Sequence, residues 1–236
     1  MSSGGNARRG TVLVAGGTGA LGTAVLTALL DADFPVVATW VDEREHAGAV
    51  TRFGDRPDLS LVRVDVLDPT SVAAAVDAVA DLHAVVNLVG GYAAHGRVHE
   101  TEPEEFDRML RLNLRPGFLL ARAALPKLVA RGGGAFVAVS ARPALEPFAG
   151  ASGYITAKAA VIAFVRALDA EYRSAGVRCN AIAPGVIDTP ANRRDQPGAD
   201  PSTWTAPAEI ASVIRFLVSD DAAVVTGGTI PVYGRS

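Results

Sequence analysis

Tyr154 and Lys158, in the stretch "SGYITAKAAV", have the types and the spacing of a proton-transfer pair. They are four positions apart, so on a helix both side chains lie on one face, one turn from each other. A phenol has a pKa of about 10 and exchanges protons poorly at neutral pH unless a nearby cation stabilises the phenolate. A lysine ammonium is such a cation. The pair therefore predicts acid–base catalysis in which Tyr154 moves the proton and Lys158 assists.

A second group of residues has the pattern of a phosphate-binding turn. The stretch "VLVAGGTGALG" places Gly16, Gly17, Gly19 and Gly22 between an apolar run and a helical segment. Glycines permit positive φ and let backbone N–H groups approach a pyrophosphate at a helix N-terminus. Because a plain tight turn does not need four glycines, this turn indicates a dinucleotide site.

The end of the next apolar run bears on the choice between NAD and NADP. An acid usually ends this strand and binds the adenosine ribose, but here that position is Trp40. Asp42 lies two residues further on, on the same side of an extended chain. It is either a ribose ligand that repels a 2′-phosphate, which slightly favours NAD, or a solvated loop acid. Asp65 ends the third strand and either accepts from the adenine amino group or caps the loop before Asp68.

An alternation of strands and helices must position these side chains. Apolar runs predict strands at 11–16, 35–41, 59–64, 84–89, 134–140, 177–183 and 229–233. Amphipathic or alanine-rich segments predict helices near 20–32, 43–50, 69–80, 103–130, 152–175 and 207–218. Uninterrupted apolar strands alternating with helices predict an α/β fold, a doubly wound parallel sheet with helices on both faces. Asp68 before Pro69 predicts a helix start, and Thr101 with Glu104 has the spacing of a capping box.

The bulk composition is that of one packed domain, predicted over residues 11–236 after a mobile arm at 1–10. Of the 236 residues, 49% are apolar and 20% charged, which suits a single core. The net charge of −3 gives no reason to expect nucleic acid or an anionic membrane as a partner. The single cysteine and the lack of an apolar run that could span a bilayer favour a cytoplasmic location. The proline-rich stretch 188–206 is the one long loop and is predicted to be a substrate lid.

Taken in order, the glycine turn, Asp65, "VNLVGG", "RLNL", "YITAK" and "APGVIDTP" resemble the motifs of the short-chain dehydrogenase/reductase family. The resemblance covers the chain from residue 11. It implies a single Rossmann-type domain that binds NAD or NADP, with Tyr154 as general acid/base. Lys158 would lower the tyrosine pKa and hold the nicotinamide ribose, Asn113 would anchor a water of the proton relay, and Asn87 would pin the neighbouring strand. The cofactor contacts expected from the residues and the resemblance are Gly16, Gly17, Thr18, Gly19, Leu21, Gly22, Trp40, Asp42, Asp65, Val66, Asn87, Val89, Gly90, Tyr154, Lys158, Pro184, Gly185, Val186, Ile187 and Thr189.

Three positions depart from the family. Ala15 and Ala20 differ from the usual glycine motif, and Ala141 stands where the serine that polarises a substrate carbonyl is expected. Removing a comparable donor typically costs about 10² to 10³ in rate. The dihydropteridine reductases within the family resemble this chain in "GGTGALG", in "VGGYA", in the lid and in an alanine at the serine position. This subgroup resemblance implies a conjugated, dihydropterin-like acceptor that is protonated on nitrogen and needs no carbonyl donor.

The neighbouring serines leave a second possibility open. With a one-residue shift of the loop, Ser140 would serve as the donor in a carbonyl or 3-oxoacyl-thioester reductase. Ser152, two residues before Tyr154, is a second spare hydroxyl, but we expect it to cap the catalytic helix. A third function class is a non-catalytic nucleotide-binding sensor. The joint presence of Tyr154, Lys158 and Asn113 counts against it.

Two further expectations concern metals and partners. His95 and His99 are four residues apart, but no third ligand follows at a recognised spacing, so we expect no metal. The helices at 103–130 and 152–175 have apolar faces beyond what one sheet needs, and in the family such faces pair between subunits. The resemblance therefore implies a homodimer or homotetramer that acts on a small-molecule substrate.

Overall fold

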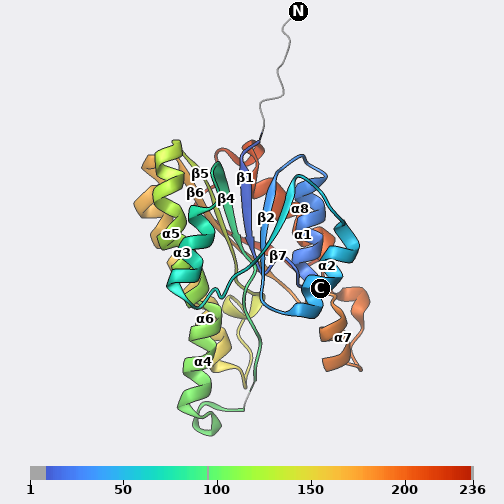
Figure 1. The fold of residues 1–236 in the computed structure, drawn as a ribbon. Coiled ribbons are helices and arrows are strands. Elements are labelled where there is room, and N and C mark those ends of the chain that lie inside the picture. The colour runs from blue at the N-terminus through green and yellow to red at the C-terminus, as the bar shows by residue number, and fades with distance from the viewer. Residues whose placement is uncertain (1–8, 95, 235–236) are drawn as a thin grey trace, which may run out of the picture.

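The core of the computed structural model is a parallel sheet of seven strands in the order β3-β2-β1-β4-β5-β6-β7 (Figure 1). The structure describes residues 9–94 and 96–234. The strands are β1 Thr11–Ala15, β2 Val36–Trp40, β3 Leu59–Arg63, β4 Leu82–Asn87, β5 Gly134–Val139, β6 Val177–Pro184 and β7 Thr229–Val232. Each of the seven predicted strands is confirmed, with its ends moved by a few residues at most.

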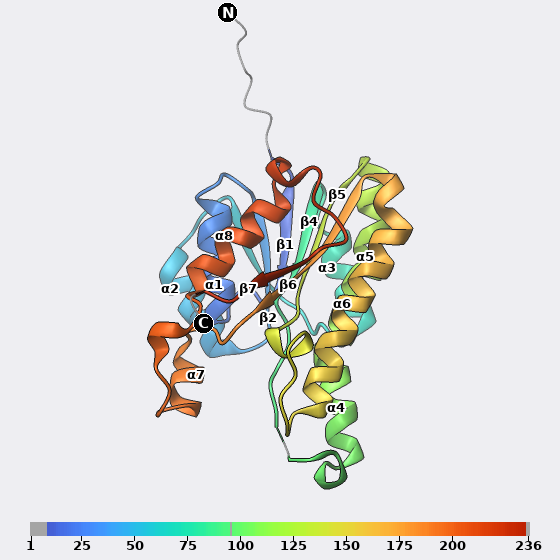
Figure 2. The same ribbon diagram turned by 180° about the vertical axis from the view of Figure 1, so that it is seen from behind.

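Helices cover both faces of this sheet (Figures 1 and 2). They are α1 Ala20–Leu30, α2 Glu43–Phe53, α3 Pro69–Asp77, α4 Pro103–Asn113, α5 Arg115–Arg131, α6 Ser152–Tyr172, α7 Pro190–Asp195 and α8 Pro207–Val218. Successive residues of a strand point to opposite faces. Leu13 therefore packs in the core under α3, α5 and α6, whereas Val12 and Val14 pack in the core under α1 and α8. The doubly wound fold class is confirmed.

The predicted helix at 103–130 is two helices, because the chain breaks at Leu114. The Pro116 ring lacks an N–H and obstructs the carbonyl four residues earlier, so a continuous helix is costly there. The predicted capping box is also wrong, since Glu102 precedes the first turn of α4 and the Thr101 hydroxyl donates to the Arg97 carbonyl at 3.1 Å. The helix start at Asp68 is confirmed, because its carboxylate accepts from the amides of Thr70 and Ser71.

The point at which the strand order of the sheet reverses matters for function. The chain leaves β1 toward β2 and β3 on one side and returns to β4, β5, β6 and β7 on the other, so the strand order reverses between β1 and β4. Ligands of such sheets bind beyond the carboxyl ends of the strands at this reversal. Figures 1 and 2 show α4 and α7 extending beyond that edge, on opposite sides of the sheet.

The predicted N-terminal arm and the predicted lid are described only in part or contain regular structure. Of the arm predicted at 1–10, residues 1–8 lie outside the described residues, whereas Gly10 is buried and the Arg9 guanidinium lies 4.6 Å from the Phe34 ring centre. The predicted lid at 188–206 contains α7. Within residues 9–94 and 96–234, none of the helices has the length and apolarity to cross a membrane.

Candidate active site

The glycine turn between β1 and α1 brings the start of the helix close to the sheet. A Cβ on Gly17 would lie 2.7 Å from the Ala38 Cβ, and a Cβ on Gly22 would lie 2.4 Å from the Gly16 carbonyl oxygen. Gly16 itself has a φ of +75°, which side chains other than glycine rarely adopt. The turn is held to β2, since the Gly16 amide donates to the Thr39 hydroxyl at 3.2 Å. Glycine is therefore needed at these three positions for packing and backbone conformation.

The N-terminus of α1 has the properties of an anion site. Gly19 caps the helix without a side-chain hydrogen bond, and the first turn contains no acidic residue. The first amides of the helix thus keep their capacity to donate, and the helix dipole favours negative charge there. Thr18 and Leu21, which were predicted to contact the cofactor, flank this turn. The residues present fit the pyrophosphate of a dinucleotide.

At the adenosine end, Trp40 and Asp42 have different environments from those expected of a ribose ligand. The Trp40 ring stacks on His46 of α2, with ring centres 4.0 Å apart. Asp42 is the N-cap of α2, and its Oδ1 accepts from the amides of Arg44 and Glu45 at 2.9 and 3.0 Å. The Asp65 carboxylate accepts from the Leu67 amide at 2.8 Å, which is the loop-capping role that the sequence left open.

Tyr154 and Lys158 lie in the first two turns of α6, on one face as predicted. The Lys158 Nζ is 5.9 Å from the centre of the Tyr154 ring and donates to the Val139 carbonyl at 3.0 Å. Gly90, in the loop after β4, approaches the same atoms. A Cβ there would lie 2.9 Å from the Lys158 Nζ and 2.7 Å from the Asn113 Oδ1. The three segments that carry Gly90, Asn113 and Lys158 therefore meet at one point.

Burial dominates the protonation of both catalytic candidates. It lowers the pKa of Lys158 from 10.5 to about 8. For Tyr154, burial and then the neighbouring Tyr92 raise the pKa from 10.0 to about 12. The pKa of Tyr154 is therefore raised overall in the protein alone, because loss of hydration is the largest influence on it. The expected lowering by Lys158 stays a prediction. Tyr154 is a neutral phenol at physiological pH.

Tyr92 is a site residue that the sequence analysis did not single out. Its ring meets the Tyr154 ring edge to face, with centres 5.1 Å apart, and 62% of its surface is exposed. It follows Gly90 and Gly91 after β4, so an aromatic residue directly after two glycines was the signal available in the sequence. Tyr92 forms an open aromatic wall beside the phenol.

Neither spare serine offers its hydroxyl beside the phenol. The Ser140 side chain is 1% exposed and donates to the Lys158 carbonyl at 2.7 Å, so its proton is used inside the protein. Ser152 was predicted to cap α6, but this prediction is wrong. The serine is the first helical residue after an Ala151 cap, and its buried Oγ has no hydrogen-bond partner among the described residues. Residues two apart on a helix do not face each other, so Ser152 points away from Tyr154.

The two asparagines both fix loops. Asn113 ends α4, and its side chain exchanges hydrogen bonds with the backbone of Gly91 at 3.1 and 3.0 Å while donating to the Met109 carbonyl at 3.0 Å. Asn87 was expected to pin the neighbouring strand. Its side chain instead accepts from the Val89 amide two residues on, at 3.2 Å. Both side chains therefore shape the loop after β4.

The segment after β6 is tied down at its start. The Gly185 amide donates to the Val232 carbonyl at 3.1 Å, and Ile187 pairs with Thr205. Thr189 caps α7 by accepting from the Asn192 amide at 3.2 Å. The predicted nicotinamide contacts Pro184, Gly185, Val186, Ile187 and Thr189 thus run from the end of β6 to the start of α7. They lie at the same edge of the sheet as the glycine turn.

Metal ligands do not gather at this edge. Across the described part of the chain, no group of three or more His, Cys, Asp or Glu side chains is arranged to hold a metal ion. His95 lies outside the described residues. His99 is exposed, and its Nε2 lies 4.0 Å from the Glu100 carboxylate.

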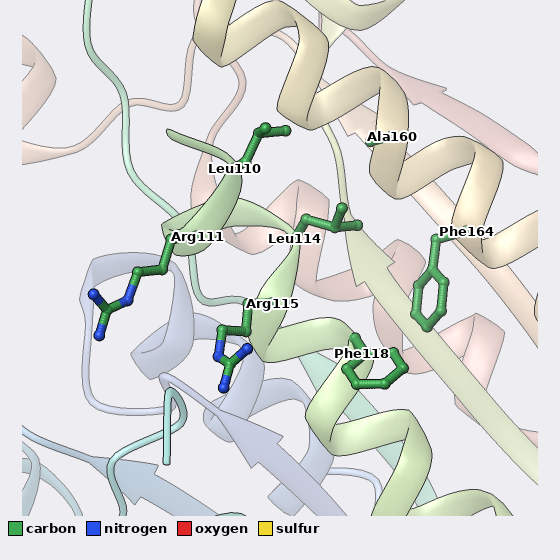
Figure 3. A pocket seen from close by; sticks show the side chains of 7 residues that line it. All are labelled: Leu110, Arg111, Leu114, Arg115, Phe118, Ala160 and Phe164. Atoms are coloured by element: carbon green, nitrogen blue, oxygen red, sulfur yellow. The ribbon is translucent and has the colours of Figure 1, made fainter. Parts of the chain in front are cut away.

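A cavity of about 620 Å³ lies elsewhere, on the outer face of α4, α5 and α6 (Figure 3). It is lined by Leu110, Arg111, Leu114, Arg115, Phe118, Ala160 and Phe164. Ala160 is two residues from Lys158, so the cavity faces away from the catalytic side of α6. Phe118 is 46% exposed, and its ring centre lies 6.3 Å from that of Phe164. This apolar patch is on the helices that were expected to pair between subunits, and it is not the reaction site.

Comparison with known proteins decides the family. Residues 16–234 match the family model described as "Enoyl-(Acyl carrier protein) reductase". The chain belongs to the short-chain dehydrogenase/reductase family. It is similar to 4-formylbenzenesulfonate dehydrogenase of Comamonas testosteroni, with 30% identity over 97% of this chain and 98% of that protein. It is also similar to 2-(R)-hydroxypropyl-CoM dehydrogenase of Xanthobacter autotrophicus, with 33% identity over 73% of this chain and 76% of that protein.

A solved structure extends the likeness to three dimensions. A short-chain type dehydrogenase/reductase from Mycobacterium ulcerans superposes with a TM-score of 0.89 and 28% identity, over 96% of this chain and 89% of that one. The short-chain dehydrogenase is therefore an NAD(P)-dependent oxidoreductase with a Rossmann-type domain. The sensor hypothesis is wrong, because the family match and the dehydrogenase relatives identify an enzyme.

Proposed function

We propose that this short-chain dehydrogenase reduces a small conjugated acceptor of the dihydropterin type, with Tyr154 as the proton donor. The nicotinamide, when bound, supplies the hydride. The chain supplies the proton, which moves from the Tyr154 hydroxyl to a ring nitrogen of the acceptor as the hydride arrives. The acceptor thus gains a hydride and a proton, which together are two electrons and two protons, and the phenolate left behind is stabilised by the nearby Lys158 ammonium.

The observation that carries this proposal is the absence of a hydroxyl at position 141. Ala141 lies two residues after β5 and is 5% exposed, and the Ser140 hydroxyl beside it donates to the Lys158 carbonyl. A carbonyl substrate builds negative charge on one oxygen and needs a donor for it. A conjugated ring spreads that charge over several atoms, so it tolerates an alanine at this position.

The protonation state of Tyr154 supports the reductive direction. Burial raises its pKa to about 12, so the phenol holds its proton at neutral pH. A reduction needs a proton donor, whereas the oxidation of an alcohol needs a base. The exposed ring of Tyr92 beside the phenol also suits a flat aromatic substrate, because offset or edge-to-face contacts between rings are favourable.

A carbonyl or 3-oxoacyl-thioester reductase is the second candidate, and the relatives favour it. Two of the similar proteins are named as dehydrogenases of 2-(R)-hydroxypropyl-CoM and of 4-formylbenzenesulfonate, whose names contain a hydroxyl and a formyl group. For this chain the reaction would require Ser140 to turn from the Lys158 carbonyl toward the substrate. The two candidates therefore differ in what the side chains at 140 and 141 contribute.

Restoring the missing hydroxyl tests the choice. The Ala141→Ser and Ser140→Ala variants and the wild type would be assayed for oxidation of reduced nicotinamide with a quinonoid dihydropterin and with a 3-oxoacyl thioester. We expect the wild type to turn over the pterin and neither substitution to change that rate more than about threefold. If the thioester alone is reduced and Ser140→Ala lowers its rate tenfold or more, roughly the low end of the cost of a lost oxyanion donor, the second candidate is correct.

For the cofactor we propose NAD rather than NADP. Asp42, which first suggested this preference, is occupied as the cap of α2. The preference is therefore supported by a different acidic side chain, which is described below.

A further inference from the structure

Glu45 lies over the phosphate-binding turn although it comes from a different helix. It is in the first turn of α2, and its Oε2 accepts from the Thr18 hydroxyl at 3.4 Å, across 27 positions of sequence. Its two carboxylate oxygens are 3.7 and 3.8 Å from the point where a Cβ on Gly19 would be. The carboxylate therefore lies at the mouth of the turn, on the side of α2.

This side of the turn is where the adenosine ribose belongs. In doubly wound sheets the acid that binds the ribose hydroxyls comes from the end of the second strand, next to the phosphate-binding turn. Here Trp40 ends that strand, and its ring is covered by His46 from the same helix as Glu45. The space between the end of β2 and the turn is thus bordered by α2, and Glu45 is the side chain of α2 that reaches the turn.

The other side chains nearby do not supply this carboxylate. The Asp42 Oδ1 already accepts two backbone amides, and the first turn of α1 contains no acid. The Trp40 Nε1 is buried and has no hydrogen-bond partner among the described residues. A buried N–H without a partner costs free energy. Trp40 therefore offers no acceptor to a ribose hydroxyl, because an indole N–H only donates.

We propose that Glu45 selects NAD(H) against NADP(H), a role that the strand-end acid has in other doubly wound sheets. The carboxylate accepts from the hydroxyls of the adenosine ribose and repels the dianion of a 2′-phosphate. Like charges a few ångströms apart at a protein surface disfavour each other by enough to change an affinity about tenfold or more. This inference rests on the nucleotide part of the proposed function and not on the identity of the acceptor.

The test is direct binding of the two reduced cofactors. Dissociation constants of NADH and NADPH would be measured by calorimetry for the full-length wild type and for Glu45→Gln, which keeps the side-chain shape and removes the charge. Glu43→Gln is the matched control, because Glu43 is an exposed acid in the same first turn of α2. A Glu45→Ala variant repeats the test without the amide.

We expect the wild type to bind NADH at least tenfold more tightly than NADPH, roughly the effect of one repelled charge. Glu45→Gln and Glu45→Ala should tighten NADPH binding about tenfold or more and leave NADH within about threefold, whereas Glu43→Gln should leave the ratio unchanged. The inference is overturned if the ratio does not respond to Glu45, if Glu43→Gln changes it equally, or if the wild type prefers NADPH. If both cofactors bind but the expected preference for NADH is missing, the enzyme class is unaffected. If neither NADH nor NADPH binds, both this inference and the proposed function are wrong.

Discussion

Replacing Lys158 with methionine should make the protein more stable than the wild type, and this gain should be larger at neutral than at alkaline pH. The reason is that keeping a buried ammonium charged lowers the free energy of unfolding of the wild type. Burial lowers the pKa of Lys158 from 10.5 to about 8, a difference of 10.5 − 8 = 2.5. At pH 7 both the folded and the unfolded protein carry this proton, so the folded state bears the whole penalty of about 3 kcal/mol. Between pH 8 and 10.5 the folded protein releases the proton while the unfolded chain keeps it. The penalty therefore declines as pH rises.

The assay is urea unfolding of the wild type and of Lys158→Met at pH 7 and at pH 9.5. The linkage relation gives a penalty of about 3 kcal/mol at the lower pH and about 1 kcal/mol at the higher, so the advantage of the variant should shrink by about 2 kcal/mol. Loss of the hydrogen bond to the Val139 carbonyl is the same at both pH values and cancels. Lys127→Met, which removes a less buried lysine, is the control. A stability difference that does not change between the two pH values would refute the reasoning.

Two further predictions concern the phenol and the subunit contact. Tyr154→Phe should lower turnover by about 10² or more while leaving cofactor dissociation constants within a few fold, since the phenol acts in the transition state. Stopped-flow oxidation of the reduced nicotinamide would show this, with Tyr92→Phe as a ring-preserving control, and near-normal turnover would exclude Tyr154 as the acid. We also expect the apolar patch at Phe118 to pair with a second copy of the chain, so that Phe118→Glu yields monomers in sedimentation velocity. A monomeric wild type would contradict this expectation.

The sequence by itself determined the features that depend only on residues close together along the chain. The seven strands follow from short apolar runs, and the start of α3 follows from Asp68 and Pro69, because a cap and a first-turn proline act within one turn. The glycine turn and the Tyr154–Lys158 pair are likewise local, since their spacing along the chain sets their geometry on a turn and on a helix. The break at Leu114 was also available, because Pro116 disfavours a continuous helix.

The tertiary structure alone decided how these groups are solvated and paired. The pKa values of Tyr154 and Lys158 depend on what covers them, and this comes from β5 and the loop after β4. The partner of Ser140 is a carbonyl 18 positions later, and the partner of Glu45 is a hydroxyl 27 positions earlier. Such contacts form only when the sheet brings strand ends together. Hydration and long-range hydrogen bonds, unlike helix and turn geometry, have no fixed spacing in sequence, so the sequence located the catalytic pair and left its chemistry to the fold.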